Sequence, residues 1–130
     1  MVLRCFIVDD SPHFLAAAQA LLEREGFVVV GVASTSAEAV RRVEATRPDA
    51  VLIDVELGTE SGFDLARRLA DETSLDRSRL IMISTYAEDD LWDLITTAPV
   101  AAFLPKARLS AGAIREILGG PNGSVAGDSS

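Results

Sequence analysis

Cysteine is almost absent from this chain of 130 residues. The single one, Cys5, excludes a disulfide within the chain and stands in the apolar run Cys5-Phe6-Ile7-Val8. A free cysteine behaves as a small hydrophobic residue and is among the residue types most often buried. We therefore expect Cys5 to be a core residue of a protein in a reducing compartment.

Long apolar runs are also missing. No stretch approaches the roughly 18 continuous apolar residues of a membrane-spanning helix. The first residues contain no basic region leading into an apolar segment with a cleavage site, which is the pattern of a secretory signal. These absences predict a cytoplasmic protein with no membrane partner.

Positive charge is scarce: 20 Asp and Glu stand against 12 Lys and Arg, for a formal net charge of −8. A protein that binds nucleic acid or an anionic membrane needs a clustered Lys/Arg face. The balance therefore argues against direct nucleic-acid binding and favours cations or basic protein surfaces as partners. Eleven of the 12 basic residues are Arg, and Lys106 is the single lysine.

What the chain does contain is the composition of an ordinary globular protein, with 48% hydrophobic and 25% charged residues. Its length favours one domain. Residues after Gly119 are almost all polar or small. We expect a folded domain over residues 1–119 and a flexible tail over 120–130, which is either a terminus or the start of a linker.

Short β-branched runs alternate with amphipathic stretches, which is typical of a parallel sheet with helices on both faces. The fold class is therefore α/β. Helix N-caps are expected at Ser11, Thr35, Thr85 and Ser110, and a loop at residues 55–61. The runs predict five strands, at residues 2–8, 27–33, 50–53, 80–83 and 100–104.

The polar residues that could carry chemistry all follow strands, and the carboxyl ends of parallel strands form the edge where α/β proteins bind ligands. They are Asp9 and Asp10 after the first strand, Asp54 after the third, Ser84 and Thr85 after the fourth, and Lys106 after the fifth.

Three converging carboxylates repel one another unless a cation lies between them. Mg²⁺ suits such a site because it takes a few oxygen ligands and keeps several waters. One carboxylate can then attack a phosphoryl group while metal, ammonium and hydroxyl stabilise the phosphoryl oxygens. These residue types indicate Mg²⁺-dependent aspartyl-phosphate chemistry.

Four motifs in this order resemble the receiver domain of two-component response regulators, over residues 2–118. The resemblance implies a flavodoxin-like, doubly wound (βα)5 fold with a parallel five-stranded sheet of order 2-1-3-4-5. The motifs are Ile7-Val8-Asp9-Asp10, Leu52-Ile53-Asp54, Ile83-Ser84 and Phe103-Leu104-Pro105-Lys106.

The resemblance also implies how phosphoryl group and metal are held. Asp54 would be the phosphoacceptor, receiving its phosphoryl group from a phosphohistidine of a sensor histidine kinase or phosphotransfer protein. Asp10 and Asp54 would bind Mg²⁺ directly with the backbone carbonyl of Glu56, and Asp9 would act through a metal-bound water.

The remaining implied roles concern the phosphoryl oxygens and the switch. Ser84 and Lys106 would each bond a phosphoryl oxygen, and Thr85 would lie beside the phosphoryl group. Phe103 matches an aromatic residue that turns inward when Ser84 moves. An aromatic residue in a strand is also a usual core residue, so both interpretations stay open for Phe103.

The chain departs from many receivers at three places. Leu57-Gly58 replaces a common Met-Pro, which predicts a more mobile loop over residues 55–62. Thr85 stands where Ala or Gly is usual, which predicts slower access of water and small phosphodonors. Proline precedes Lys106 instead of following it.

Two further residues have open interpretations. Trp92 would lie on the flank of the helix after Thr85, as packing or as an interface anchor. His13 would be a solvated surface residue or one that tunes the acidic site.

The preferred function is a signalling switch that is phosphorylated on Asp54. Its output surface would comprise the fourth helix, the fifth strand and the fifth helix, for an output partner or a homodimer. A first alternative is a Mg²⁺-dependent phosphohydrolase, although Glu56 replaces the second Asp that such an enzyme carries two residues after its nucleophile. A second is a receiver-like interaction module without phosphorylation. In the preferred function the protein is not an enzyme beyond its own phosphorylation and dephosphorylation.

Overall fold

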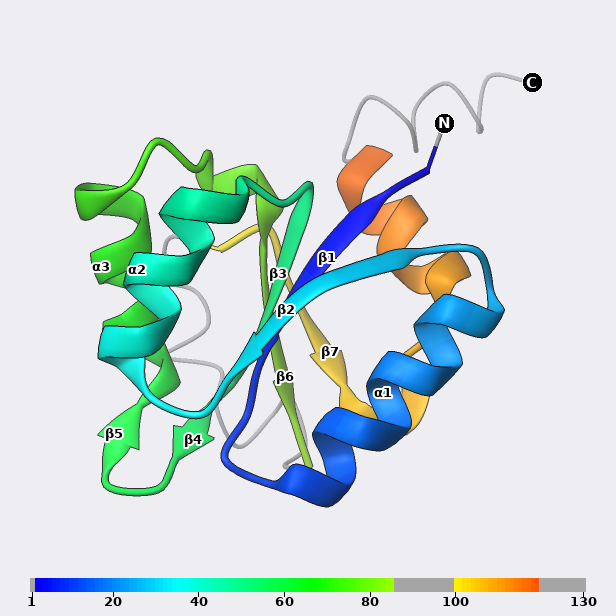
Figure 1. Cartoon of the computed structure of the whole chain (residues 1–130), viewed down its shortest axis with the longest axis horizontal. Coiled ribbons are helices and arrows are strands. Elements are labelled where there is room, and N and C mark those ends of the chain that lie inside the picture. The colour runs from blue at the N-terminus through cyan, green and yellow to red at the C-terminus, as the bar shows by residue number, and fades with distance from the viewer. Residues whose placement is uncertain (1, 86–99, 120–130) are drawn as a thin grey trace.

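A five-stranded parallel sheet forms the centre of the protein (Figure 1). The computed structural model describes residues 2–85 and 100–119. The sheet order is β2-β1-β3-β6-β7, which is the expected 2-1-3-4-5 order once two short extra strands enter the numbering. Its strands are β1 (Arg4–Val8), β2 (Val28–Ala33), β3 (Ala50–Asp54), β6 (Leu80–Ser84) and β7 (Ala102–Pro105).

Helices cover both faces of this sheet, as the alternation in the sequence predicts. Figure 1 shows α2 (Ser36–Thr46) and α3 (Gly62–Glu72) on one side, with α1 (Pro12–Arg24) and the helix at 111–119 on the other. Successive side chains of a strand point to opposite faces, so Phe6 packs in the cluster under α2 and α3, whereas Ile7 packs in the cluster under α1. Both faces are therefore apolar.

Cys5 lies in this core without solvent exposure, as expected. Burial, with a smaller contribution from the charge of Asp49, raises the pKa of the Cys5 thiol to about 12. The side chain is therefore a neutral thiol at physiological pH, which is the form that packs in an apolar core.

Three of the four expected helix caps, at Ser11, Thr35 and Ser110, are confirmed, whereas the helix expected after Thr85 lies outside the described residues. Ser11 Oγ accepts from the Phe14 amide at 3.3 Å, and Thr35 Oγ1 accepts from the Glu38 amide at 3.3 Å. The Glu38 carboxylate accepts from the Ser34 amide. In a standard capping box it would accept from the amide of the N-cap residue itself, Thr35. Ser110 caps the 111–119 helix through the Ala113 amide.

The segment after β3 is not a loop throughout, although a loop was expected for residues 55–61. It forms a small antiparallel hairpin of β4 (Glu56–Leu57) and β5 (Glu60–Ser61), with Gly58 at φ +64° in the turn. Glu60 Oε1 accepts from the Ser36 amide at 2.9 Å and so attaches the hairpin to the N-terminus of α2. The loop interpretation was wrong because the turn and this long-range bond organise the segment.

Element ends shift by one or two residues from the expected positions. β1 begins at Arg4 and β7 at Ala102, while β3 and β6 extend through Asp54 and Ser84. Two 3₁₀ turns, η1 (Arg77–Arg79) and η3 (Lys106–Arg108), precede β6 and follow β7. The expected helix with Trp92 and the tail over 120–130 lie outside the described residues. Within the described part of the chain, no helix is both long and apolar enough to cross a membrane.

Candidate functional site

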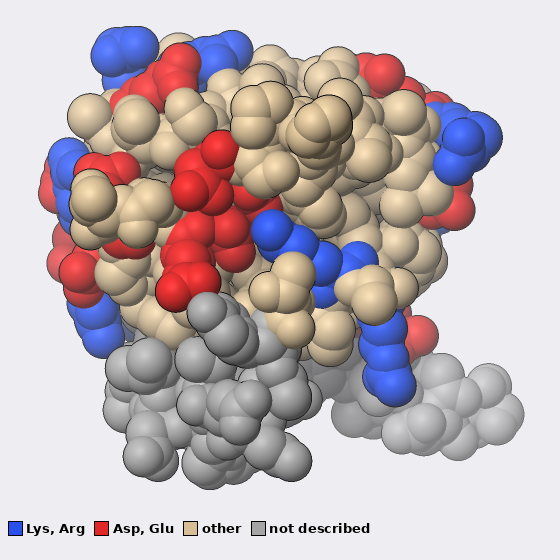
Figure 2. Space-filling view, turned by 90° about the horizontal axis from the view of Figure 1, so that it is seen from below, with Lys and Arg blue, Asp and Glu red and all other residues tan. Residues whose placement is uncertain are grey.

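Strand register brings the predicted polar residues to one edge of the sheet. Val8 pairs with Ile53, so the next residues, Asp9 and Asp54, emerge from neighbouring strands at the same level. On the other side of β3, Asp54 pairs with Ile83 of β6, and Ser84 is the next residue of that strand. Ser84 in turn pairs with Pro105, which precedes Lys106. Figure 2 shows acidic side chains gathered in the middle of this face with basic side chains beside them.

The charged groups of this edge lie within contact distance of one another. Carboxylate oxygens of Asp9, Asp10 and Asp54 all lie within 4.8 Å of one another. The Lys106 ammonium lies 2.6 Å from Asp9 Oδ2 and 3.5 Å from Asp54 Oδ2. Asp9 is fully buried and Asp54 is 8% exposed, whereas Asp10 is exposed. One ammonium therefore pairs with the two carboxylates that are withdrawn from water, and the exposed Asp10 carboxylate lies beside them.

Hydrogen bonds satisfy only part of these carboxylates. Asp9 Oδ1 accepts from the Ser11 amide at 2.8 Å, which fixes the side chain at the start of α1. Asp9 Oδ2 receives no well-aligned hydrogen bond from any described residue, although it forms the ion pair with Lys106. Asp54 Oδ1 accepts from the Glu56 amide at 3.4 Å, a long bond.

Burial, with a smaller contribution from the charge of Asp9, raises the pKa of Asp54 to about 6 against the opposing effects of Lys106 and of the Glu56 amide. The negative charge at this edge is therefore incompletely compensated. A hard cation can supply the missing positive charge, because Mg²⁺ prefers carboxylate oxygens and three carboxylates converge here with one ammonium beside them. The donor set fits Mg²⁺.

The other predicted site residues surround this cluster. Ser84 is buried at the end of β6, and Thr85 follows it as an exposed residue. Glu56 is exposed at the start of β4, directly after the strand that carries Asp54. The structure thus brings Asp9, Asp10, Asp54 and Lys106 into one cluster by distance, and places Ser84 and Glu56 beside it through register and the Glu56 amide bond.

One residue at this edge was not among the predicted site residues. The Phe14 ring centroid lies 4.3 Å from the Lys106 ammonium. Its position in the helical pattern predicted only core packing, and Phe14 does pack against the core cluster under α1. The available signal was its place in the first turn after Asp9 and Asp10, which brings it to the same edge.

The structure places two residues whose roles the sequence left open, His13 and Phe103. His13 is exposed in the first turn of α1, as expected of a solvated residue. Phe103 is half-buried on β7 and packs against the core cluster under α2 and α3. Its switching role stays a prediction.

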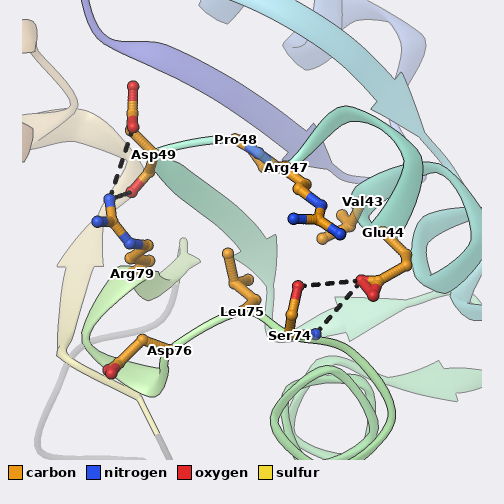
Figure 3. A pocket seen from close by; sticks show the side chains of 9 residues that line it. All are labelled: Val43, Glu44, Arg47, Pro48, Asp49, Ser74, Leu75, Asp76 and Arg79. Carbon is orange, nitrogen blue, oxygen red and sulfur yellow. Dashed lines mark hydrogen bonds and ion pairs between the residues drawn. The ribbon is translucent and has the colours of Figure 1, made fainter.

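A separate pocket of about 340 Å³ lies between the end of α2 and the segment before β6 (Figure 3). Much of its charge is paired within it. Arg79 contacts the carboxylate and carbonyl of Asp49, and Glu44 accepts from both donors of Ser74. Asp49 precedes β3 and Arg79 precedes β6, so this pocket lies at the opposite edge of the sheet from Asp54.

Sequence comparison identifies the family. The model of the response regulator receiver domain matches residues 5–117. The chain belongs to the receiver domain family of response regulators. The predicted family and fold are thereby confirmed, and the cluster of Asp residues lies in a domain whose members generally bind Mg²⁺ at an acidic pocket.

Curated relatives of the receiver are longer proteins. The transcriptional regulatory protein DesR of Bacillus subtilis is 30% identical over 119 residues, which are 88% of the receiver and 58% of DesR. The transcriptional regulatory protein PdtaR of Mycobacterium tuberculosis is 27% identical over 103 residues, 79% of the receiver and 49% of PdtaR. The receiver spans less than two thirds of either relative.

Solved structures show the same fold. A two-component response regulator of the LuxR family from Aurantimonas sp. superposes with a TM-score of 0.80 at 24% identity, covering 94% of the receiver and 92% of that chain. A Burkholderia pseudomallei response regulator, solved with a phosphorylated aspartic acid, calcium ion and citrate, gives 0.76 at 22% identity over 98% and 73% of the chains.

Proposed function

We propose that this receiver takes a phosphoryl group on Asp54 and thereby switches a signalling surface. The observation that carries the proposal is the convergence of three carboxylates and the single lysine at one sheet edge. Asp54 ends the middle one of three neighbouring strands. Asp9 follows the strand on one side of it, and Ser84 ends the strand on the other side.

The donor would be a phosphohistidine of a sensor histidine kinase or phosphotransfer protein. A carboxylate oxygen of Asp54 attacks phosphorus, the phosphorus–nitrogen bond breaks, and its electron pair stays on the histidine nitrogen. Lys106, 3.5 Å from Asp54 Oδ2, is placed to bond a phosphoryl oxygen, and Ser84 would bond another. Thr85, exposed next to Ser84, would limit access of water to the product.

Asp10 and Asp54 would hold Mg²⁺ together with the backbone carbonyl of Glu56, and Asp9 would contribute through a water ligand. The bound ion supplies positive charge to the oxygens of the transferring phosphoryl group. The convergence of the three carboxylates and the raised pKa of Asp54 support this assignment.

The output would pass through β7, the helix at 111–119 and the segment 86–99 between β6 and β7, to an output partner or a second copy. Ser84 pairs with Pro105 and Met82 pairs with Phe103, so a shift of Ser84 acts on the strand that carries Phe103. In this role the protein turns over no separate substrate.

The test uses beryllium fluoride, a phosphoryl mimic, with Mg²⁺, and follows the fluorescence of the single tryptophan, Trp92, or the amide NMR spectrum. We expect a Mg²⁺-dependent change in the native chain and none in Asp54→Asn. Asp71→Asn, an exposed carboxylate on α3, is the matched control and should respond like the native chain.

Two results would contradict the proposal. One is an equal response of native chain and Asp54→Asn. The other is steady Mg²⁺-dependent hydrolysis of a phosphomonoester, which would assign the site to a phosphohydrolase instead.

A further inference from the structure

Among the described residues, the Lys106 ammonium lies close to two carboxylates and to one aromatic ring. Asp9 Oδ2 lies at 2.6 Å, Asp54 Oδ2 at 3.5 Å, and the Phe14 ring centroid at 4.3 Å. The lysine side chain is 16% exposed. An ammonium within about 6 Å of a ring centroid is attracted by the negative face of the ring, and withdrawal from water strengthens the attraction.

The Phe14 ring is held in place independently of the lysine. The Phe14 amide donates to Ser11 Oγ in the capped first turn of α1, and the side chain packs against the core cluster under that helix. Asp9 Oδ1 accepts from the Ser11 amide in the same turn. One turn of α1 therefore fixes both an anionic and an aromatic neighbour of Lys106.

We propose that Phe14 is a positioning residue that keeps the Lys106 ammonium at the phosphoacceptor edge through a cation–π contact. This inference rests on the proposed function for its consequence, but not for the contact itself. A bound metal would compete with Lys106 for the oxygens of Asp9 and Asp54, and a phosphoryl group would take up an Asp54 oxygen in its new bond. Neither competes for an aromatic face, so the ring is the neighbour that stays with the ammonium when the site is loaded.

The alternative is that Phe14 only fills the core. The two roles differ in how they depend on the charge of Lys106. A packing residue contributes equally whether residue 106 is Lys or Met, whereas a cation–π partner contributes only to Lys.

The first experiment examines the contact without phosphoryl chemistry. In NMR spectra of the full chain in chelator, the Hε protons of Lys106 should be shifted upfield by the Phe14 ring. The shift should disappear in Phe14→Leu and persist in Phe14→Tyr. Absence of a shift in the native chain would overturn the proposal, even if Phe14→Leu does not fold.

The second experiment measures beryllium fluoride affinity with Mg²⁺. Phe14→Leu should weaken binding by about 2- to 30-fold, equivalent to the ~0.5–2 kcal/mol of a cation–π contact. Phe14→Tyr should retain native affinity, as should Leu21→Met, a conservative change of a half-buried residue on the same helix.

A double-mutant comparison decides between the two roles. In the Lys106→Met background, Phe14→Leu should have little further effect on affinity. An equal loss in both backgrounds would overturn the proposal and assign Phe14 to packing alone. If the native chain binds no beryllium fluoride, the proposed function fails, while the upfield shift still reports on the contact.

Discussion

The fold disfavours the charged form of the Asp54 carboxylate. Its pKa in the folded chain, about 6, lies above the ordinary value of 3.8 because of burial and the charge of Asp9. A raised pKa means that the folded chain binds the proton more tightly than the unfolded chain does. The free energy of unfolding therefore falls as the pH rises from about 4 through about 6, and it stays lower at pH 7.

We expect Asp54→Asn to stabilise the metal-free protein at pH 7, because the amide carries no charge. The difference should be about 1–3 kcal/mol at pH 7 and should shrink to about 0.5 kcal/mol near pH 4, where Asp54 is protonated in the folded chain and about half protonated in the unfolded chain. Urea unfolding in chelator at the two pH values measures it, with Asp71→Asn as control. A variant no more stable than the native chain at pH 7 would contradict the expectation.

At Gly62, the backbone of Asp54 and Val55 lies too close to leave space for a side chain. A Cβ atom there would lie 1.9 Å from the Asp54 carbonyl oxygen. We expect Gly62→Ala to destabilise the fold by about 1–3 kcal/mol or more, because α3 must move away from the end of β3. Thermal unfolding measures the loss.

Gly112 provides the matched control for Gly62, because it lies exposed in the helix at 111–119. The nearest atom to its Cβ position is Ser110 Oγ at 3.9 Å. Gly112→Ala should stabilise the protein by up to about 1 kcal/mol through helix propensity. Equal effects of the two substitutions would show that crowding at Asp54 is not the cause.

At the scale of elements, the sequence predicted features that depend on residues close together in the chain, such as helix caps. Ser11, Thr35 and Ser110 cap their helices because the side-chain oxygen of each reaches the amide three residues ahead. The hairpin of β4 and β5 was missed because Glu60 acts on Ser36, 24 residues away. The contact of Phe14 with Lys106 was missed for the same reason, since each partner alone has an ordinary local role.

The Glu60–Ser36 bond makes the hairpin and α2 one unit, which is testable. Glu60→Ala should cost about 0.5–1.5 kcal/mol and speed hydrogen exchange at the Ser36 amide, because that amide loses its acceptor. Glu72→Ala is the control, since it removes only the exposed pair with Arg68 on α3. Unchanged exchange at Ser36 in Glu60→Ala would refute the attachment.

At the scale of the molecule, part of the net charge of −8 is concentrated at one edge of the sheet. Three carboxylates at one edge make a cation site, so Mg²⁺ should stabilise the folded protein by mass action. We expect the melting temperature to rise with the logarithm of Mg²⁺ concentration once the ion exceeds its dissociation constant.

Asp10→Asn should reduce this dependence on Mg²⁺ and, because Asp10 is exposed, leave the metal-free fold intact. Glu72→Gln, which changes an exposed charge on α3, should keep the native dependence. If the melting temperature of the native chain does not respond to Mg²⁺, the metal assignment is wrong.

The position of β1 has a consequence for the order in which the chain can fold during synthesis. Although β1 is the first strand of this sheet to be synthesised, it lies between β2 and β3. Its second neighbour exists only after Asp54 has been made, and Glu25 must wait for the Ala111 amide, 86 residues later. Until then the apolar cluster under α1 lacks Ala111 and Ile114, so the nascent chain depends on late residues to complete the burial of its earliest strand.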